Sequence, residues 1–101
     1  MEHIVMDGPS LSTAELDPRR KKILYRSWHR GMKEMDLLMG NYADHYLPTM
    51  SEEELDEFEK LIEVPDQHLF CWITGTEQVP DNYNGSVYKA MLAFYQSPQF
   101  S

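Results

Sequence analysis

A single glycine, Gly31, stands where two amphipathic helical patterns meet. Glycine inside a helix costs about 1 kcal/mol relative to alanine, whereas just past a helix end it is favoured, in the left-handed region. The sequence therefore predicts two helices that meet at Gly31, with Arg30 in the last turn of the first and Glu34 in the first turn of the second. Because neither Met32 nor Lys33 is a favoured N-cap, one continuous helix with an Arg30–Glu34 pair stays an alternative.

The two charges would flank an open corner at Gly31. Since glycine has no side chain, a partner's backbone could approach this corner closely. Spacing alone favours a plainer interpretation, because an Arg and a Glu four residues apart are common on solvated helix faces and contribute only about 0.2–0.5 kcal/mol.

The first two helices are predicted over residues 18–30 and 32–47. Asp17 and Pro18 are a favoured N-cap and first helical residue. In the second helix, Gly40 predicts a bend or a close helix contact. The apolar stripes of these helices consist of Ile23, Leu24, Trp28, Met35, Leu38, Met39, Tyr42 and Tyr46.

The third helix has the clearest start. Ser51 and Glu54 fit a capping box, Met50 and Leu55 fit a hydrophobic staple, and Pro65 closes the element.

Two shorter helices follow. Asp66 is predicted to cap a fourth helix over residues 67–74, which is apolar nearly all round and should be the centre of the core. Its cysteine, Cys71, is most simply a small buried hydrophobe. A loop over residues 75–85 then leads to a fifth helix over residues 86–96.

These patterns predict an all-α fold, a single small five-helix bundle over residues 17–101. Alternating apolar residues typical of strands are absent from the sequence. Residues 1–16 show no sustained period and are predicted to be a flexible N-terminal tail. A chain of 101 residues builds one core.

Charge is distributed unevenly along the chain. The formal net charge is −8, yet seven of the nine basic residues lie between Arg19 and Lys33, and nine acidic residues lie between Asp44 and Asp66. The net charge disfavours nucleic acid as a partner. The alternative hypothesis is a small nucleic-acid-binding or regulatory adaptor that contacts phosphates through residues 19–22 of the first helix.

Enzymatic and metal chemistry find no support in the sequence. It holds no glycine-rich phosphate loop, no serine nucleophile motif and a single cysteine. The four histidines do not fall at metal-ligand spacing. We therefore predict neither a catalytic constellation nor a metal site, and a protein that is not an enzyme.

The sequence also bears on location. It shows no secretory signal, no mitochondrial presequence and no apolar run near the about 20 residues that cross a bilayer. A cytoplasmic protein without membrane insertion is the prediction.

The run of residues 26–36, followed by Leu-Phe-Cys-Trp at 69–72, resembles the small helical FAD assembly factors of succinate dehydrogenase. Their hallmark is an Arg-Gly-x-x-Glu motif, which stands complete at residues 30–34. The resemblance extends in order and length over roughly residues 19–96.

This resemblance implies a chaperone that binds the flavoprotein subunit of succinate dehydrogenase, and in some bacteria that of fumarate reductase, and promotes its covalent flavinylation. FAD would be attached to the client and not held stably by this chain. The motif residues Arg30, Gly31 and Glu34 would bind the client, with His29, Met32 and Lys33 as contact neighbours.

Overall fold

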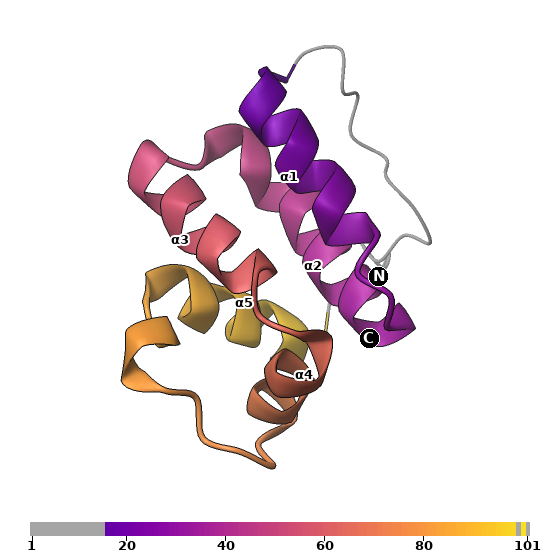
Figure 1. Ribbon diagram of the computed structural model, residues 1–101, viewed down its shortest axis with the longest axis vertical. Coiled ribbons are helices and arrows are strands. Elements are labelled where there is room, and N and C mark those ends of the chain that lie inside the picture. The colour runs from indigo at the N-terminus through magenta and orange to yellow at the C-terminus, as the bar shows by residue number, and fades with distance from the viewer. Residues whose placement is uncertain (1–15, 99, 101) are drawn as a thin grey trace.

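The computed structural model describes residues 16–98 and 100. Five α-helices and two short 3-10 helices follow one another without a strand in this part of the chain (Figure 1). They are α1 Pro18–Trp28, α2 Lys33–Tyr46, η2 Leu47–Thr49, α3 Glu52–Ile62, α4 Asp66–Thr74, η3 Asp81–Tyr83 and α5 Ser86–Gln96. The predicted all-α, five-helix fold is confirmed. The predicted tail falls outside the described residues apart from Leu16, which packs against the core.

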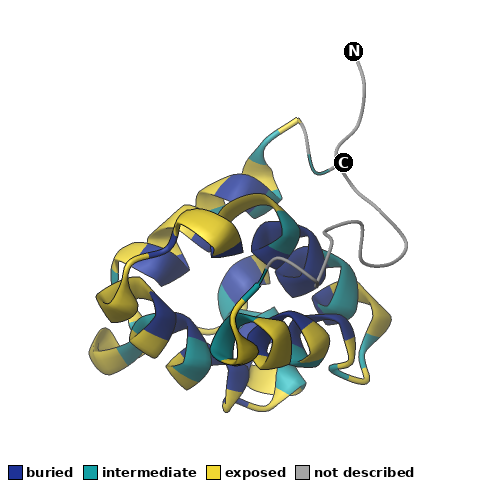
Figure 2. Ribbon diagram, turned by 90° about the horizontal axis from the view of Figure 1, so that it is seen from above, coloured by how far each residue is buried: buried dark blue, intermediate teal, exposed yellow. Residues whose placement is uncertain are grey.

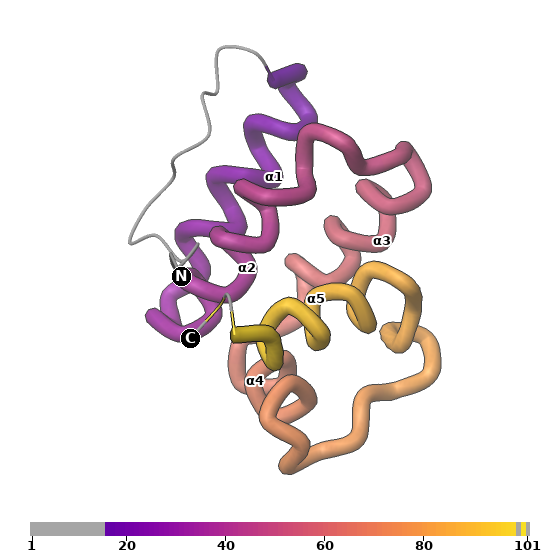
Figure 3. Tube along the Cα trace, turned by 180° about the vertical axis from the view of Figure 1, so that it is seen from behind, coloured from indigo at the N-terminus to yellow at the C-terminus, as the bar shows by residue number. Residues whose placement is uncertain are grey.

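The core lies between α1, α2, α3 and α5. Helix α5 packs against α2 and α3 and crosses the face seen in Figure 3. The buried faces of the helices turn toward this centre and their exposed faces turn to solvent (Figure 2). The largest fully buried side chains are Tyr88, Phe58, Ile23, Leu24, Met35, Leu38, Met39, Leu47, Leu55, Leu61, Leu69 and Met91.

Helix α4 is not the centre of the core, which corrects the prediction. It lies at the lower edge in Figure 1 and buries only Leu69 and Ile73. Cys71 and Trp72 are half-buried, and the Trp72 ring packs against Tyr83 of η3 with the ring centroids 5.3 Å apart. A helix that is apolar all round can therefore lie at an edge when the following loop covers part of it.

Helices α1 and α2 meet closely at Gly40. A Cβ added there would lie 2.3 Å from Cδ2 of the Trp28 ring, well inside contact distance. The predicted close helix contact is confirmed. Trp28 is buried, and its indole nitrogen has no hydrogen-bond partner among the described residues, so apolar packing holds this ring in place.

The first turn of α1 ties this helix to the following elements. The Arg19 guanidinium pairs with Glu52, Asp56 and Glu59 of α3 at 2.9, 2.5 and 2.7 Å. Hydrogen bonds to Glu59 and Asp56 raise the pKa of Arg19. A cation at a helix N-terminus opposes the dipole, and these carboxylates offset that cost.

Arg20 makes the second connection from this turn. Its Nε donates to the Leu47 carbonyl at 3.0 Å and its Nη2 to the Met50 carbonyl at 2.5 Å. Asp17 caps the helix by accepting from the Arg20 backbone N–H at 3.2 Å. The hydrogen bond from the Arg20 side chain lowers the pKa of the Asp17 carboxyl.

Carboxylates cap the later helices as well. The predicted capping box is confirmed, because Ser51 Oγ accepts from Glu54 N at 3.1 Å and Glu54 Oε1 accepts from Ser51 N at 2.8 Å. Helix α5 is capped from outside its own segment: Glu57 Oε2 of α3 accepts from Val87 N at 2.6 Å. A Cβ on Gly85 would lie 2.5 Å from that same oxygen, so glycine leaves room for this cap.

Substituting Gly40→Ala tests the α1–α2 contact. Alanine favours a helix by up to about 1 kcal/mol over glycine, but the clash with Trp28 should outweigh this and lower the free energy of unfolding by about 1–3 kcal/mol. Urea titration measures the change. Adding Trp28→Phe, which presents a smaller ring, should recover part of the loss, and a single variant as stable as wild type would contradict the packing argument.

Alkaline pH tests the burial of Tyr42. Burial raises the pKa of Tyr42 to about 12. Between the ordinary value of about 10 and this one, the folded state binds more protons than the unfolded state, so stability is full below pH about 10 and falls as pH rises toward 12. Tyr42→Phe should remove about 1–1.5 kcal/mol of the fall between pH 9 and pH 11 in urea titrations. The exposed Tyr25→Phe is the control, and equal slopes in both variants would refute the assignment.

Candidate functional site at the link between α1 and α2

The chain breaks its helical course between α1 and α2. Helix α1 ends at Trp28, His29 follows with φ −125° and ψ 58°, and Gly31 adopts φ +115°. Two helices thus meet here as predicted, and a continuous helix is excluded. The predicted end of the first helix at Arg30 is wrong by two residues, so Arg30 belongs to the link.

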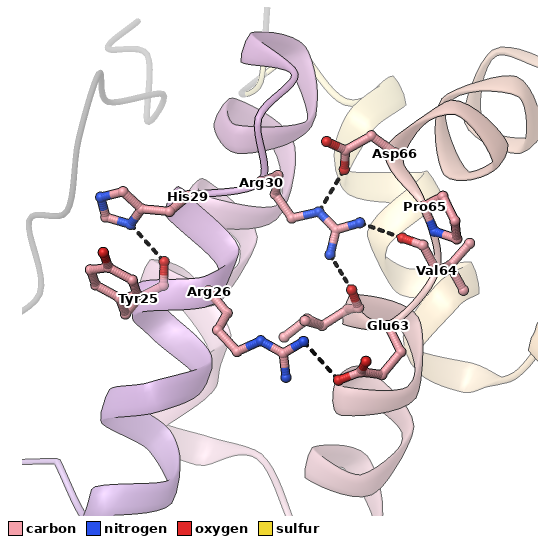
Figure 4. Close-up of a pocket in the computed structure, with 9 residues that line it drawn as sticks. Tyr25, Arg26, His29, Arg30, Glu63, Val64, Pro65 and Asp66 are labelled. Carbon is pink, nitrogen blue, oxygen red and sulfur yellow. Dashed lines mark hydrogen bonds and ion pairs between the residues drawn. The ribbon is translucent and has the colours of Figure 1, made fainter.

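Arg30 points inward, against the end of α3 (Figure 4). Its side chain is 6% exposed, and its Nε donates to Asp66 Oδ1 at 2.7 Å. One terminal nitrogen donates to the Val64 carbonyl at 2.5 Å and the other to the Ile62 carbonyl. The last carbonyls of a helix lack internal partners and carry the negative end of its dipole, which explains why a guanidinium binds there.

This geometry corrects the predicted orientation of Arg30. The sequence pattern predicts Arg30 on the open corner opposite Glu34, or paired with Glu34 along one helix. Its carboxylate partner is instead Asp66, which is 36 residues away and itself 14% exposed at the side chain. Arg30 therefore supports the corner from its inner side and does not lie on the exposed surface.

Two aspartates hold the backbone of the link. Asp36 Oδ1 accepts from the Arg30 and Gly31 backbone N–H groups at 2.5 and 3.2 Å, and Asp66 Oδ2 accepts from Met32 N at 3.1 Å. Met32 is the N-cap of α2 and offers no capping side chain. The aspartates therefore supply carboxylate acceptors at the start of α2, where a positive dipole end favours them.

Neither of these two aspartate roles is predicted from the sequence pattern. Asp66 was predicted to cap α4, but Pro65 is the N-cap of that helix and no side chain caps it. The position of Asp36 in the first turn of α2 was a usable signal, because acidic side chains there often reach back to free N–H groups. No local signal connects Asp66 to Met32.

The other predicted site residues form the solvent side of the corner. Gly31, Lys33 and Glu34 are exposed and Met32 is half-buried. Glu34 also lines an apolar groove of about 460 Å³ together with Leu37, Tyr95 and Phe100.

His29 is exposed at the end of α1 and its orientation is fixed. Its Nδ1–H donates to the Tyr25 carbonyl at 2.8 Å, and its ring stacks on the Tyr25 ring with centroids 4.0 Å apart. The corner thus brings together all six predicted residues, five of them facing solvent at least in part and Arg30 supporting them.

Known proteins with a similar sequence indicate the family of this chain. Residues 21–95, which include the α1–α2 link, match the family described as the flavinator of succinate dehydrogenase. The chain belongs to this family. The resemblance drawn from residues 26–36 and the Arg-Gly-x-x-Glu motif is confirmed.

Individual relatives agree with this assignment. The mitochondrial succinate dehydrogenase assembly factor 2 of Danio rerio is 40% identical over 81 residues, which cover 78% of this chain and 51% of the relative. The proteins of the same name from Yarrowia lipolytica and Saccharomyces cerevisiae are 42% identical over 65 residues and 34% over 88, covering 64% and 83% of this chain and 45% and 54% of the relatives. The chain spans about half the length of the curated relatives it matches.

Two further observations concern other kinds of site. In the described part of the chain, no three His, Cys, Asp or Glu side chains gather as a metal site. None of the helices described there combines the length and apolarity that a bilayer crossing needs.

Arg30→Lys tests the structural role of the motif arginine. Lysine keeps the charge but cannot bind Asp66 and two carbonyls with one planar fork, so the free energy of unfolding should fall by about 2–4 kcal/mol. Urea titration measures it. The control is Arg26→Lys, at a surface pair, which should change stability by no more than about 0.5 kcal/mol. Equal effects of the two variants would refute a supporting role specific to Arg30.

Proposed function

We propose that this protein is a non-enzymatic assembly factor that binds the flavoprotein subunit of succinate dehydrogenase and promotes the covalent attachment of FAD to it. One observation carries the proposal: the segment that matches the flavinator family presents Gly31 and Glu34 of its Arg-Gly-x-x-Glu motif at a fixed, exposed corner, which the inward-pointing Arg30 supports. The relatives named as succinate dehydrogenase assembly factors support the same client.

The corner is suited to docking because it is already ordered. Arg30, Asp36 and Asp66 fix the link through side-chain hydrogen bonds. A surface that is rigid before binding loses little conformational entropy when a partner docks. Gly31 admits the client backbone closely, and Glu34 accepts hydrogen bonds from client donors at the start of α2.

The residues next to Gly31 and Glu34 extend the proposed contact with the client. Lys33 is exposed beside Glu34, Met32 gives a half-buried apolar contact, and His29 presents the edge of its ring that does not bond Tyr25. These residues surround Gly31 on the chain, so one docked client segment can touch all of them.

The chemistry belongs to the client. Linking a client histidine to the 8α-methyl group of the flavin requires removal of a proton from that group and a place for negative charge on the ring. The assembly factor acts by stabilising the client arrangement in which these groups are aligned. FAD is attached on the client and is not held stably by this chain, and the flavoprotein of fumarate reductase is a second client of the same kind.

The cellular location follows that of the client. The relatives carry "mitochondrial" in their names, whereas the sequence pattern predicts a cytoplasmic protein. Imaging a tagged full-length protein beside a mitochondrial marker, in a cell type that has both compartments, distinguishes them.

The nucleic-acid alternative is weakened because the two arginines expected to bind phosphate are already bound within the protein. It relied on residues 19–22, yet Arg19 pairs with three α3 carboxylates and Arg20 binds two backbone carbonyls and Asp17. Lys21 and Lys22 are the exposed basic residues that remain in this turn. Two lysines on a chain of net charge −8 give a weak phosphate-binding surface.

A flavinylation assay tests the proposed function. The purified protein is mixed with an apo flavoprotein subunit of succinate dehydrogenase and FAD, and covalent flavin is read by in-gel fluorescence after denaturation. Wild type should accelerate labelling and Glu34→Ala should reduce the acceleration about tenfold or more, because a central contact contributes more than about 1.4 kcal/mol. Glu53→Ala, an exposed change of equal charge on α3, should leave it unchanged.

Gly31→Arg provides a second variant for the same assay. The φ of +115° strains any side chain at this position, so Gly31→Ala is the matched control for strain. Arginine should abolish the acceleration while alanine reduces it less, since only arginine blocks approach. No acceleration by the wild-type protein would refute the proposed function.

A further inference from the structure

A surface pocket lies beside the corner, between the end of α1 and the segment that joins α3 to α4 (Figure 4). Its volume is about 330 Å³. Tyr25 and His29 form one wall, and Arg30 is shared between the pocket and the corner. A client segment that docks at Gly31 is therefore within reach of this pocket.

The charges in the pocket divide into a fixed set and an exchangeable pair. Arg30 and Asp66 are fixed, since both are nearly buried and bind several groups of the protein. The exchangeable pair is Arg26 and Glu63, whose Nη2 and Oε2 lie 2.7 Å apart with side chains 37% and 68% exposed. Such an exposed pair contributes only about 0–1 kcal/mol, so another anion can replace one member at small cost.

Glu63 is the member that can leave. It is the C-cap of α3, where the negative end of the helix dipole opposes a carboxylate. Its side chain is nearly twice as exposed as that of Arg26, so Glu63 can turn into solvent while Arg26 stays against the pocket. The position that Glu63 leaves lies next to the Arg26 guanidinium, which lines the pocket.

We propose that this pocket receives a carboxylate side chain of the flavoprotein client, which binds Arg26 in place of Glu63. This inference rests on the proposed function and names a second contact of the same interface. An anion is favoured over a cation because two guanidinium groups line the pocket, and once Glu63 has turned away the lining keeps one carboxylate, Asp66, which is already bound to Arg30. His29 adds a ring nitrogen on the wall that makes no bond to Tyr25.

Substitutions of the pair have opposite expected effects. Glu63→Gln removes the internal competitor and should tighten binding to the apo flavoprotein subunit about two- to fivefold, whereas Arg26→Gln should weaken it about fivefold or more. In the Arg26→Gln background, Glu63→Gln should have no effect. Isothermal titration calorimetry at low and high salt measures the affinities.

The control for net charge is Glu53→Gln, which changes the charge equally on an exposed position of α3 outside the pocket. It should leave the affinity unchanged. Urea titrations of every variant confirm that folding is intact, since the substituted side chains are partly or largely exposed.

The outcomes separate this inference from the proposed function. If wild type binds the client and Glu34→Ala weakens binding, but Glu63→Gln leaves the affinity unchanged or lowers it, the pocket inference alone is overturned. A lowered affinity would mean that the client brings a cation to Glu63. If Glu63→Gln instead promotes self-association in sedimentation, the occupant is a second copy of this chain, and a wild-type protein that does not bind the client overturns both proposals.

Discussion

The guanidinium of Arg30 is the interaction on which the rest of the corner depends. It donates hydrogen bonds to two backbone carbonyls at the end of α3. Its third hydrogen bond orients the Asp66 carboxylate. With Asp66 held in this position, its second oxygen is placed to accept from Met32 N at the start of α2. One side chain thus fixes three helix ends, those of α3, α4 and α2, relative to one another.

This arrangement separates two tasks within a five-residue motif. The Arg30 side chain is buried and bound within the fold, Gly31 supplies a backbone conformation with φ +115°, and Glu34 remains at the surface. A loss of function on changing Arg30 would therefore not by itself show contact with a client. Changes at Glu34 report on the surface more directly, because its side chain is exposed at the first turn of α2.

Features that depend on neighbouring residues could be predicted from the sequence. The helix break at Gly31, the capping box at Ser51 and the all-α fold are of this kind, because spacing and local backbone preference determine them. The inward direction of Arg30 and the cap that Glu57 gives to α5 could not, because their partners lie 36 and 30 residues away. The edge position of α4 was missed for a related reason: its hydrophobicity shows that it packs, but not how many neighbours it has.

The ion pairs between α1 and α3 fix the direction of the two helices. Arg19 joins their first turns and Arg26 joins their last, so α1 and α3 run parallel (Figure 1). Parallel neighbours align their peptide dipoles, so like ends repel and the pair lacks the mutual compensation of an antiparallel arrangement. The three glutamates that open α3 offset one end, and Arg26 and Arg30 offset the other. A cation at the α1–α2 link therefore stabilises this fold itself, whether or not a client ever touches it.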